Sequence, residues 1–172
     1  IAEHYQWVDS VYPGDSYLMQ FTSNHDENSW NGTEFERLGQ EARHFAVLSA
    51  TLPDMLLIYN GQESAFNRRL RFFEKDTISW GNYNYSGFYQ ILADLKERNR
   101  AIFNGSKGGK LQILSQPADS TIFAFMKSSH NDKILVLCNL SDSFLKYKVP
   151  EIQQSGTFKE IFTAVNISFD SE

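Results

Sequence analysis

Two short apolar runs constrain the fold of this chain more than any other feature. Residues 18–23 and residues 55–59 are mostly apolar, and each run ends abruptly in polar residues. Between them, Thr33 and Glu36 form the capping-box pattern that begins a helix. Apolar residues then follow at helical spacing until Pro53 ends the pattern, at Phe35, Leu38, Ala42, Phe45, Leu48 and Leu52. Strand, helix and strand in this order predict a βαβ unit with parallel strands.

The polar residues after each run are candidates for function. Asn24, His25 and Asp26 follow the first run, and Asn60-Gly61-Gln62-Glu63 follows the second. In an α/β barrel the carboxyl ends of the strands carry the chemistry. An Asp beside a His can hold a sugar ring by its hydroxyls or stabilise a positive transition state, although a structural ion pair is the simpler alternative. For Gln62 and Glu63 we favour a scaffold role, in which they hydrogen-bond neighbouring loops.

The composition of the chain changes near residue 105, from a helical pattern to strand-like runs. Apolar spacing predicts a second helix from about Ser86, its candidate cap, to Asn104-Gly105. A Gly-rich linker, 105–109, then precedes short strand-like runs at 110–115, 121–128, 133–140, 144–149 and 157–162. Their spacing indicates an antiparallel β-sandwich. The predicted fold class is therefore α/β plus all-β, with an α/β part over 1–104 and an all-β part over 105–172.

Three segments carry a resemblance to alpha-amylase family glycoside hydrolases. Phe21–Asp26 resembles the family's fourth signature, at the end of barrel strand seven, and Leu52–Glu63 resembles the strand-eight segment. Phe73–Trp80 is similar to part of the barrel's last long loop. Asp54, where the family often has Gly, and Asn60, in place of a second Tyr, depart from the pattern. The resemblance implies a partial (β/α)8 barrel, strands 7 and 8 with their helices, followed by a domain C β-sandwich that lacks its last strand.

The resemblance also implies a reaction. It indicates a retaining glycosidase that hydrolyses α-glucosidic bonds in starch-like glucans, with a nucleophile and an acid/base carboxylate on strands four and five. Neither strand is within this sequence, so we expect a segment of a longer parent enzyme that is inactive alone. Asp26 would be a catalytic residue, the carboxylate that stabilises the transition state. The substrate contacts implied are His25, Asn24, Asn28 and Trp30.

Several alternatives stay open on the sequence alone. The parent could be a glucan transglycosylase, or a non-catalytic barrel relative that acts as an interaction subunit. The β-sandwich could be a carbohydrate-binding module, although a structural cap is favoured. Trp80, Tyr83 and Tyr85 lie in loops expected near the cleft, where their rings either stack on sugar or pack within the loops. We expect the isolated chain to self-associate, because two parallel strands leave unpaired edges.

The composition of the chain argues against some classes of binding partner. A net charge of −5 and a pI near 5.4 argue against nucleic acid or an anionic membrane, and no apolar run approaches the roughly 20 residues that cross a bilayer. One His and one Asp do not complete a metal-ligand set, so we expect no metal and no cofactor in these residues, while the family allows calcium in the parent. Cys138 is expected to be a buried thiol, and Arg68, Arg69 and Arg71 a salt-bridge set. A secreted or cell-envelope parent is slightly favoured.

Overall fold

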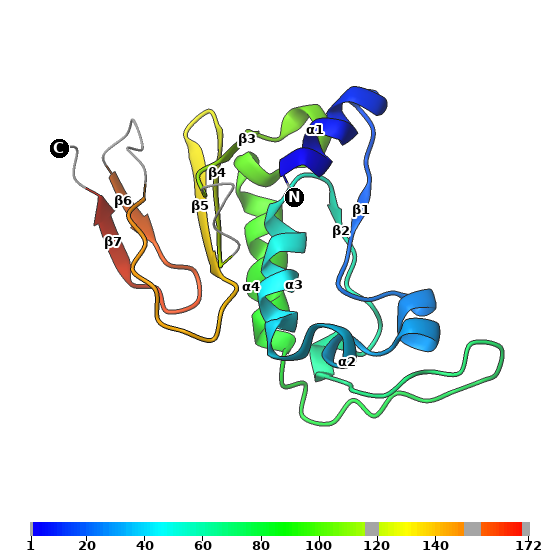
Figure 1. Ribbon diagram of the computed structural model, residues 1–172. Helices are drawn as coiled ribbons and strands as arrows, with labels where there is room; N and C mark the ends of the chain where they lie inside the picture. The colour runs from blue at the N-terminus through cyan, green and yellow to red at the C-terminus, as the bar shows by residue number, and fades with distance from the viewer. Residues whose placement is uncertain (1, 116–120, 150–155, 170–172) are drawn as a thin grey trace.

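The computed structural model describes residues 2–115, 121–149 and 156–169. Its first part contains a helix, a short strand, two consecutive helices, a second short strand and a long helix (Figure 1). These elements are α1 (Ala2–Val11), β1 (Met19–Gln20), α2 (Glu34–Leu38), α3 (Ala42–Thr51), β2 (Met55–Leu56) and α4 (Ser86–Arg98). The segment between β2 and α4 is irregular apart from a 3₁₀ turn over Gln62–Ser64.

The predicted βαβ unit is present. Met19 pairs with Met55 and Gln20 with Leu56, and the two strands run parallel. Hydrogen bonds of 2.9 Å from Met55 N to Leu18 O and from Leu57 N to Gln20 O hold them together. Both strands are shorter than the apolar runs that predicted them, because beyond the ladder the backbone turns to other partners. Arg37, for example, donates to the carbonyl oxygen of Thr22.

The helix predicted over 35–52 is divided in two. The capping box forms as predicted: Glu36 N donates to Thr33 Oγ1 at 3.2 Å, and Thr33 N donates to Glu36 Oε2 at 2.7 Å. The break follows at Gly39, whose φ of +58° lies in the left-handed region that glycine adopts without steric cost. A 3₁₀ turn over Gly39–Glu41 then leads into α3. The apolar spacing continues across this turn, so the pattern alone does not reveal the break.

Helix α4 also differs from its prediction at both ends. Its N-cap is Tyr85, and Ser86 is the first helical residue. The helix ends at Arg98, about a turn and a half before the predicted end near Asn104. Asn99 ends it by leaving helical geometry, and the Asn99 side chain then accepts from Ala101 N at 2.9 Å to begin a 3₁₀ turn over Arg100–Ile102.

The second part is built from antiparallel strands, as predicted. Strands β3 (Lys110–Ile113), β4 (Ile122–Ser129) and β5 (Asp132–Asn139) form one sheet in that order, and β6 (Gly156–Lys159) pairs with β7 (Asn166–Phe169) in a separate hairpin. Strand β7 was not predicted. The run 144–149 forms no strand over its described residues, and Tyr147 donates instead to the carbonyl of Leu114 at 2.8 Å.

A single hydrophobic core joins the two parts. Leu48 and Leu52 from α3 and Ile102 from the turn after α4 pack with residues of β4 and β5, among them Phe123, Phe125, Ile134, Val136 and Cys138. The thiol of Cys138 is buried as predicted, and burial raises its pKa to about 11. This core contains residues from both sides of the predicted boundary between residues 104 and 105. The sheet β3–β5 is therefore packed directly on the helices that position the strand ends (Figure 1).

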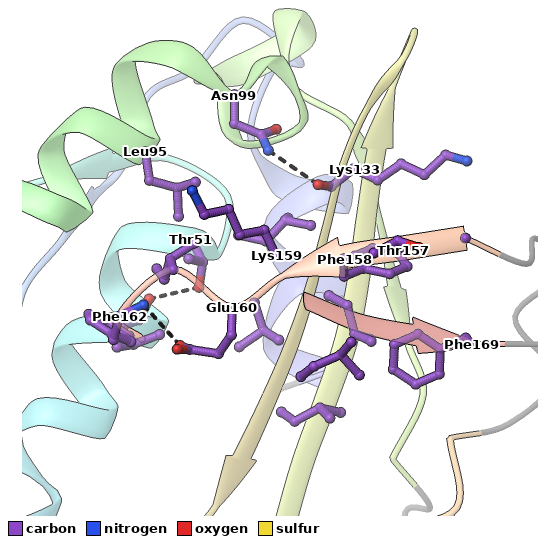
Figure 2. A pocket seen from close by; sticks show the side chains of 18 of the residues that line it. Thr51, Leu95, Asn99, Lys133, Thr157, Phe158, Lys159, Glu160, Phe162 and Phe169 are labelled. Carbon is purple, nitrogen blue, oxygen red and sulfur yellow. Dashed lines mark hydrogen bonds between the residues drawn. The ribbon is translucent and has the colours of Figure 1, made fainter. Parts of the chain in front are cut away.

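The β6–β7 hairpin meets the rest of the molecule across a cavity of about 580 Å³. Figure 2 shows this cavity between the hairpin, β5 and the ends of α3 and α4. Its apolar lining includes Leu95, Phe158, Phe162 and Phe169. Phe162 stacks on Phe88 of α4 at 5.5 Å between ring centroids, which anchors the loop of the hairpin to the helix. No helix in the described part of the chain is long and apolar enough to cross a membrane.

Candidate functional site

The segment after strand β1 contains two buried residues that are followed by exposed ones. Thr22 and Ser23 are buried, whereas the side chains of His25 and Asp26 are 68% and 62% exposed. Asn24 Oδ1 accepts from Glu27 N at 2.8 Å and so fixes the turn that follows. His25 Nε2 lies 3.6 Å from Asp26 Oδ2. The fold therefore presents an imidazole and a carboxylate side by side to solvent at a strand end.

The ends of the two parallel strands share one hollow of about 270 Å³. His25 and Ser29 line it from the segment after β1, and Tyr59 and Asn60 line it from the segment after β2. The remaining wall is the irregular loop after β2, through Leu70, Arg71, Phe72, Glu74, Asp76 and Ile78. The parallel pairing predicted from the sequence thus brings His25 and Asn60 to one place. Asn60 and Arg71 provide hydrogen-bond donors in the hollow, and Glu74 and Asp76 provide acceptors. Leu70, Phe72 and Ile78 make part of its wall apolar.

A buried hydrogen-bond network supports the strand end from below. Gln62 Nε2 lies 2.7 Å from Thr22 Oγ1, 2.5 Å from Glu34 Oε2 and 3.0 Å from Tyr89 Oη. Gln62 Oε1 accepts from Tyr59 N at 2.6 Å, and Thr22 Oγ1 donates to Glu34 Oε2 at 2.8 Å. The network joins both strand ends to α2 and α4. The scaffold role predicted for Gln62 is confirmed.

The carboxyl of Glu34 is the titratable group at the centre of this network. Burial raises its pKa, and hydrogen bonds from Thr22 and Gln62, together with the nearby charge of Arg37, act in the opposite direction. Arg37 also donates through Nη2 to Thr22 O at 2.5 Å and through Nε to Gly32 O at 3.1 Å. Arg37 therefore ties the strand end to the loop after it, a role that no feature of the sequence indicated.

Of the two further predicted substrate contacts, Asn28 is buried and Trp30 is exposed. Asn28 is buried, its Oδ1 accepts from Leu70 N at 2.7 Å, and its Nδ2 donates to Arg68 O at 3.3 Å. Its amide thus holds the loop after β2 against the segment after β1. Trp30 is exposed, and its ring contacts Phe72 at 5.2 Å and Phe73 at 6.0 Å between centroids. Sequence reasoning missed both phenylalanines, because an aromatic pair in a sequence is typical of a core.

The other loop aromatics contact neighbouring rings, and Tyr83 is 51% exposed. Trp80 and Tyr83 stack on each other at 5.8 Å, and Tyr85 contacts Phe35 and Phe88. The three arginines of the loop form the predicted ion pairs, Arg68 with Asp76, Arg69 with Glu36 and Arg71 with Glu74. The hydrogen bonds from Arg68, Arg71 N and Thr77 N hold the pKa of Asp76 well below its usual range. Within the described residues, no cluster of three or more His, Cys, Asp or Glu side chains could hold a metal ion.

Comparison with known structures identifies the fold. The chain aligns over 98% of its length with 38% of an alpha-amylase from Lactobacillus plantarum, at a TM-score of 0.74 and 17% identity. It aligns over 97% of its length with 40% of a noncanonic maltogenic alpha-amylase from Thermotoga neapolitana, at a TM-score of 0.72 and 17% identity. No protein-family model matches the chain, and no curated protein matches its sequence.

These likenesses place the chain in a structural class. Its fold is that of a segment of an alpha-amylase, the class of glycoside hydrolase that the sequence motifs resemble, and the resemblance is confirmed at the level of the fold. The chain spans about two fifths of the length of each of these amylases.

Proposed function

We propose that this chain is the C-terminal segment of a retaining glycoside hydrolase that cleaves α-glucosidic bonds in starch-like glucans. In this proposal β1 and β2 are the last two strands of a (β/α)8 barrel, and β3–β7 belong to a domain C β-sandwich. One observation carries the proposal: His25 and Asp26 are exposed side by side after β1, and His25 lines a hollow together with Tyr59 and Asn60 of the segment after β2. The fold in which they lie is shared with alpha-amylases.

In the proposed mechanism Asp26 acts through its negative charge. Its carboxylate accepts hydrogen bonds from sugar hydroxyls, and its charge favours the oxocarbenium-like transition state over the neutral ground state. His25 donates to the same sugar, and the short distance between the two side chains lets both contact one ring. Asn24 and Trp30 are the further contacts, and Asn28 contributes by holding the loop that faces the sugar.

The chemical steps need two more carboxyl groups. A retaining glycosidase uses a nucleophile and an acid/base about 5 Å apart. Asp26 supplies neither in this proposal, so the 172-residue chain alone is inactive, and the parent protein provides both from its upstream strands. Calcium, where the parent binds it, is proposed to bind outside these residues. A catalytic parent is favoured over an inactive relative, because the strand end keeps its exposed carboxylate. A glucan transglycosylase stays the alternative, because transfer uses the same carboxylate.

The test is Asp26→Asn in the full-length parent enzyme, assayed on maltohexaose. This change removes the charge and keeps the shape, so turnover should fall at least about a hundredfold while the protein stays folded. Asp15→Asn, which alters an exposed carboxylate in the turn before β1, is the matched control and should leave turnover unchanged. Turnover within about twofold of the wild type for Asp26→Asn would refute the proposed role.

A further inference from the structure

We infer that the side chains of Trp30, Phe72 and Phe73, hereafter the aromatic platform, bind a second sugar ring of the glucan chain, next to the ring at His25 and Asp26. The inference rests on the proposed function and extends it. It assigns a subsite to two phenylalanines in the loop after β2, and it commits to a neutral α-linked glucan as the ligand.

The platform is a continuous exposed aromatic surface. The ring centroids of Phe72 and Phe73 are 4.8 Å apart, and Trp30 lies 5.2 Å from Phe72 and 6.0 Å from Phe73. Phe73 is 84% exposed, Trp30 57% and Phe72 39%. Three large rings gathered on a surface lose free energy to water unless something covers them, and contiguous patches of this kind mark binding sites.

The platform is joined to the strand end through Phe72. The ring of Phe72 stacks on the imidazole of His25, with 5.8 Å between centroids and 25° between planes. Phe72 and His25 also line the same hollow. A sugar ring at His25 therefore lies next to Phe72, which belongs to the platform. In this inference the next ring of the same glucan chain stacks on the platform.

The loop that carries the platform is held in place before any ligand binds. Leu70 N donates to Asn28 Oδ1 at 2.7 Å, and Ser29 Oγ donates to Leu70 O at 2.8 Å, so the residue two before Phe72 is fixed on both sides. Arg68 donates to both carboxylate oxygens of Asp76, at 2.8 and 2.9 Å, which closes the base of the loop. A preorganised surface loses less conformational entropy on binding, which favours affinity.

Charge around the platform selects a neutral ligand. Its charged neighbours are paired with opposite charges, Arg71 with Glu74 at 2.6 Å and Arg68 with Asp76 at 2.8 Å. A polyanionic ligand is disfavoured, because it needs unpaired cations. A protein partner is disfavoured as well, because the centre of a protein interface is depleted of charged residues, whereas Arg71 and Glu74 are 68% and 66% exposed directly beside the rings. A hexose fits both features, because its C–H face stacks on a ring and its hydroxyls bond the charged rim.

The experiment follows the indole N–H signals of the 172-residue chain, labelled with ¹⁵N, as methyl α-glucoside, which has one sugar ring, and maltohexaose are added. The chain has three tryptophans, Trp7, Trp30 and Trp80, and a Trp30→Phe variant assigns the relevant signal. Maltohexaose should shift the Trp30 signal saturably, methyl α-glucoside should shift it far less, and Trp7 should not move. Phe73→Ala should weaken maltohexaose binding about three- to tenfold and leave methyl α-glucoside binding unchanged.

Two further variants keep the result interpretable. Phe144→Ala removes a fully exposed phenylalanine outside the platform and should bind maltohexaose like the wild type. Phe73→Trp keeps a stacking ring and should retain affinity. If Phe73→Ala binds maltohexaose as tightly as the wild type while the imidazole signals of His25, followed in the same titrations, still respond to methyl α-glucoside, the platform is refuted and the proposed function stands. If neither sugar shifts His25 or Trp30, the proposed function fails, and the platform with it.

Discussion

At the scale of single residues, Gln62 is the polar side chain on which the strand end most depends. Its amide contacts Thr22, Glu34, Tyr89 and the backbone of Tyr59, all in the buried network. Removing it takes one hydrogen-bond partner from each of these groups, and a buried polar group that loses its partner costs more free energy than the hydrogen bond itself contributes.

Gln62→Ala should therefore lower the free energy of unfolding by about 2–4 kcal/mol. Urea unfolding followed by circular dichroism measures this change. Gln40→Ala, at an exposed position in the turn before α3, is the control and should change stability by less than about 0.5 kcal/mol. A Gln62→Ala protein as stable as this control would mean that the network does not support the strand end.

Residue roles could be predicted only where the sequence places the partners in a recognisable order. Polar residues directly after an apolar run predicted the position of His25 and Asp26 and the scaffold role of Gln62. Asn28 was different, because its partners Arg68 and Leu70 are 40 and 42 residues away on an irregular loop. No periodic pattern connects such positions, so its role in holding the loop could not be predicted.

At the scale of elements, the capping box at the start of α2 joins the helix to the loop after β2. Thr33 Oγ1 accepts from Glu36 N and also donates to Asn67 Oδ1 at 2.5 Å. One hydroxyl therefore both begins the helix and holds the loop that leads to Arg68. The first turn of α2 also carries Glu34 of the buried network, so the position of the cap affects the site.

Thr33→Ala should lower the free energy of unfolding by about 1–2 kcal/mol, since a cap and a buried hydrogen bond are lost together. Thr33→Ser keeps the hydroxyl and should recover most of the loss. Thermal and urea unfolding of the three proteins give the comparison. The expectation is contradicted if the Ser and Ala variants are equally destabilised, because the methyl group rather than the hydroxyl would then matter.

The type of each helix or strand was predicted better than its first and last residues. Parallel strands around the helix, the capping box and β3–β5 followed from apolar spacing. The break at Gly39 was missed because apolar residues stay in phase across it, and β7 was missed although Ile167 and Phe169 alternate with polar residues. The run 144–149 alternates similarly but forms no strand over its described residues, since Tyr147 bonds Leu114 through its side chain rather than its backbone.

At the scale of the whole molecule, the shared core brings together two lysines, Lys127, which is buried, and Lys96, which is partly buried. Lys96 of α4 donates to Asp54 O at 2.6 Å, and Lys127 of β4 is buried nearby. Burial lowers the pKa of each lysine to about 8, and the charge of Asp54 acts in the opposite direction for both. The charge of Lys96 lowers the pKa of Lys127 further.

This cluster predicts the pH dependence of stability. Both folded pKa values lie below the unfolded value of 10.5, so between about pH 8 and pH 10 the unfolded chain binds more protons. The free energy of unfolding should therefore rise over that interval. Above about pH 10 it should fall, because burial raises the pKa of Tyr5 and Tyr89. Urea unfolding at about pH 7.5 and about pH 9.5 measures the rise, and Lys127→Met should reduce it. A stability that falls over this interval would contradict the lysine assignment.

The most direct test of the central claim is whether sugar binds at the end of β1. The chain has four histidines, so the imidazole signals of His25 can be assigned with a His25→Gln variant and followed as maltose is added. The account predicts a saturable shift at His25, lost in Asp26→Asn, with no shift at His130, which lies in the turn between β4 and β5. Unchanged His25 signals at saturating maltose, or a response confined to His130, would contradict the assignment of a sugar site to this strand end.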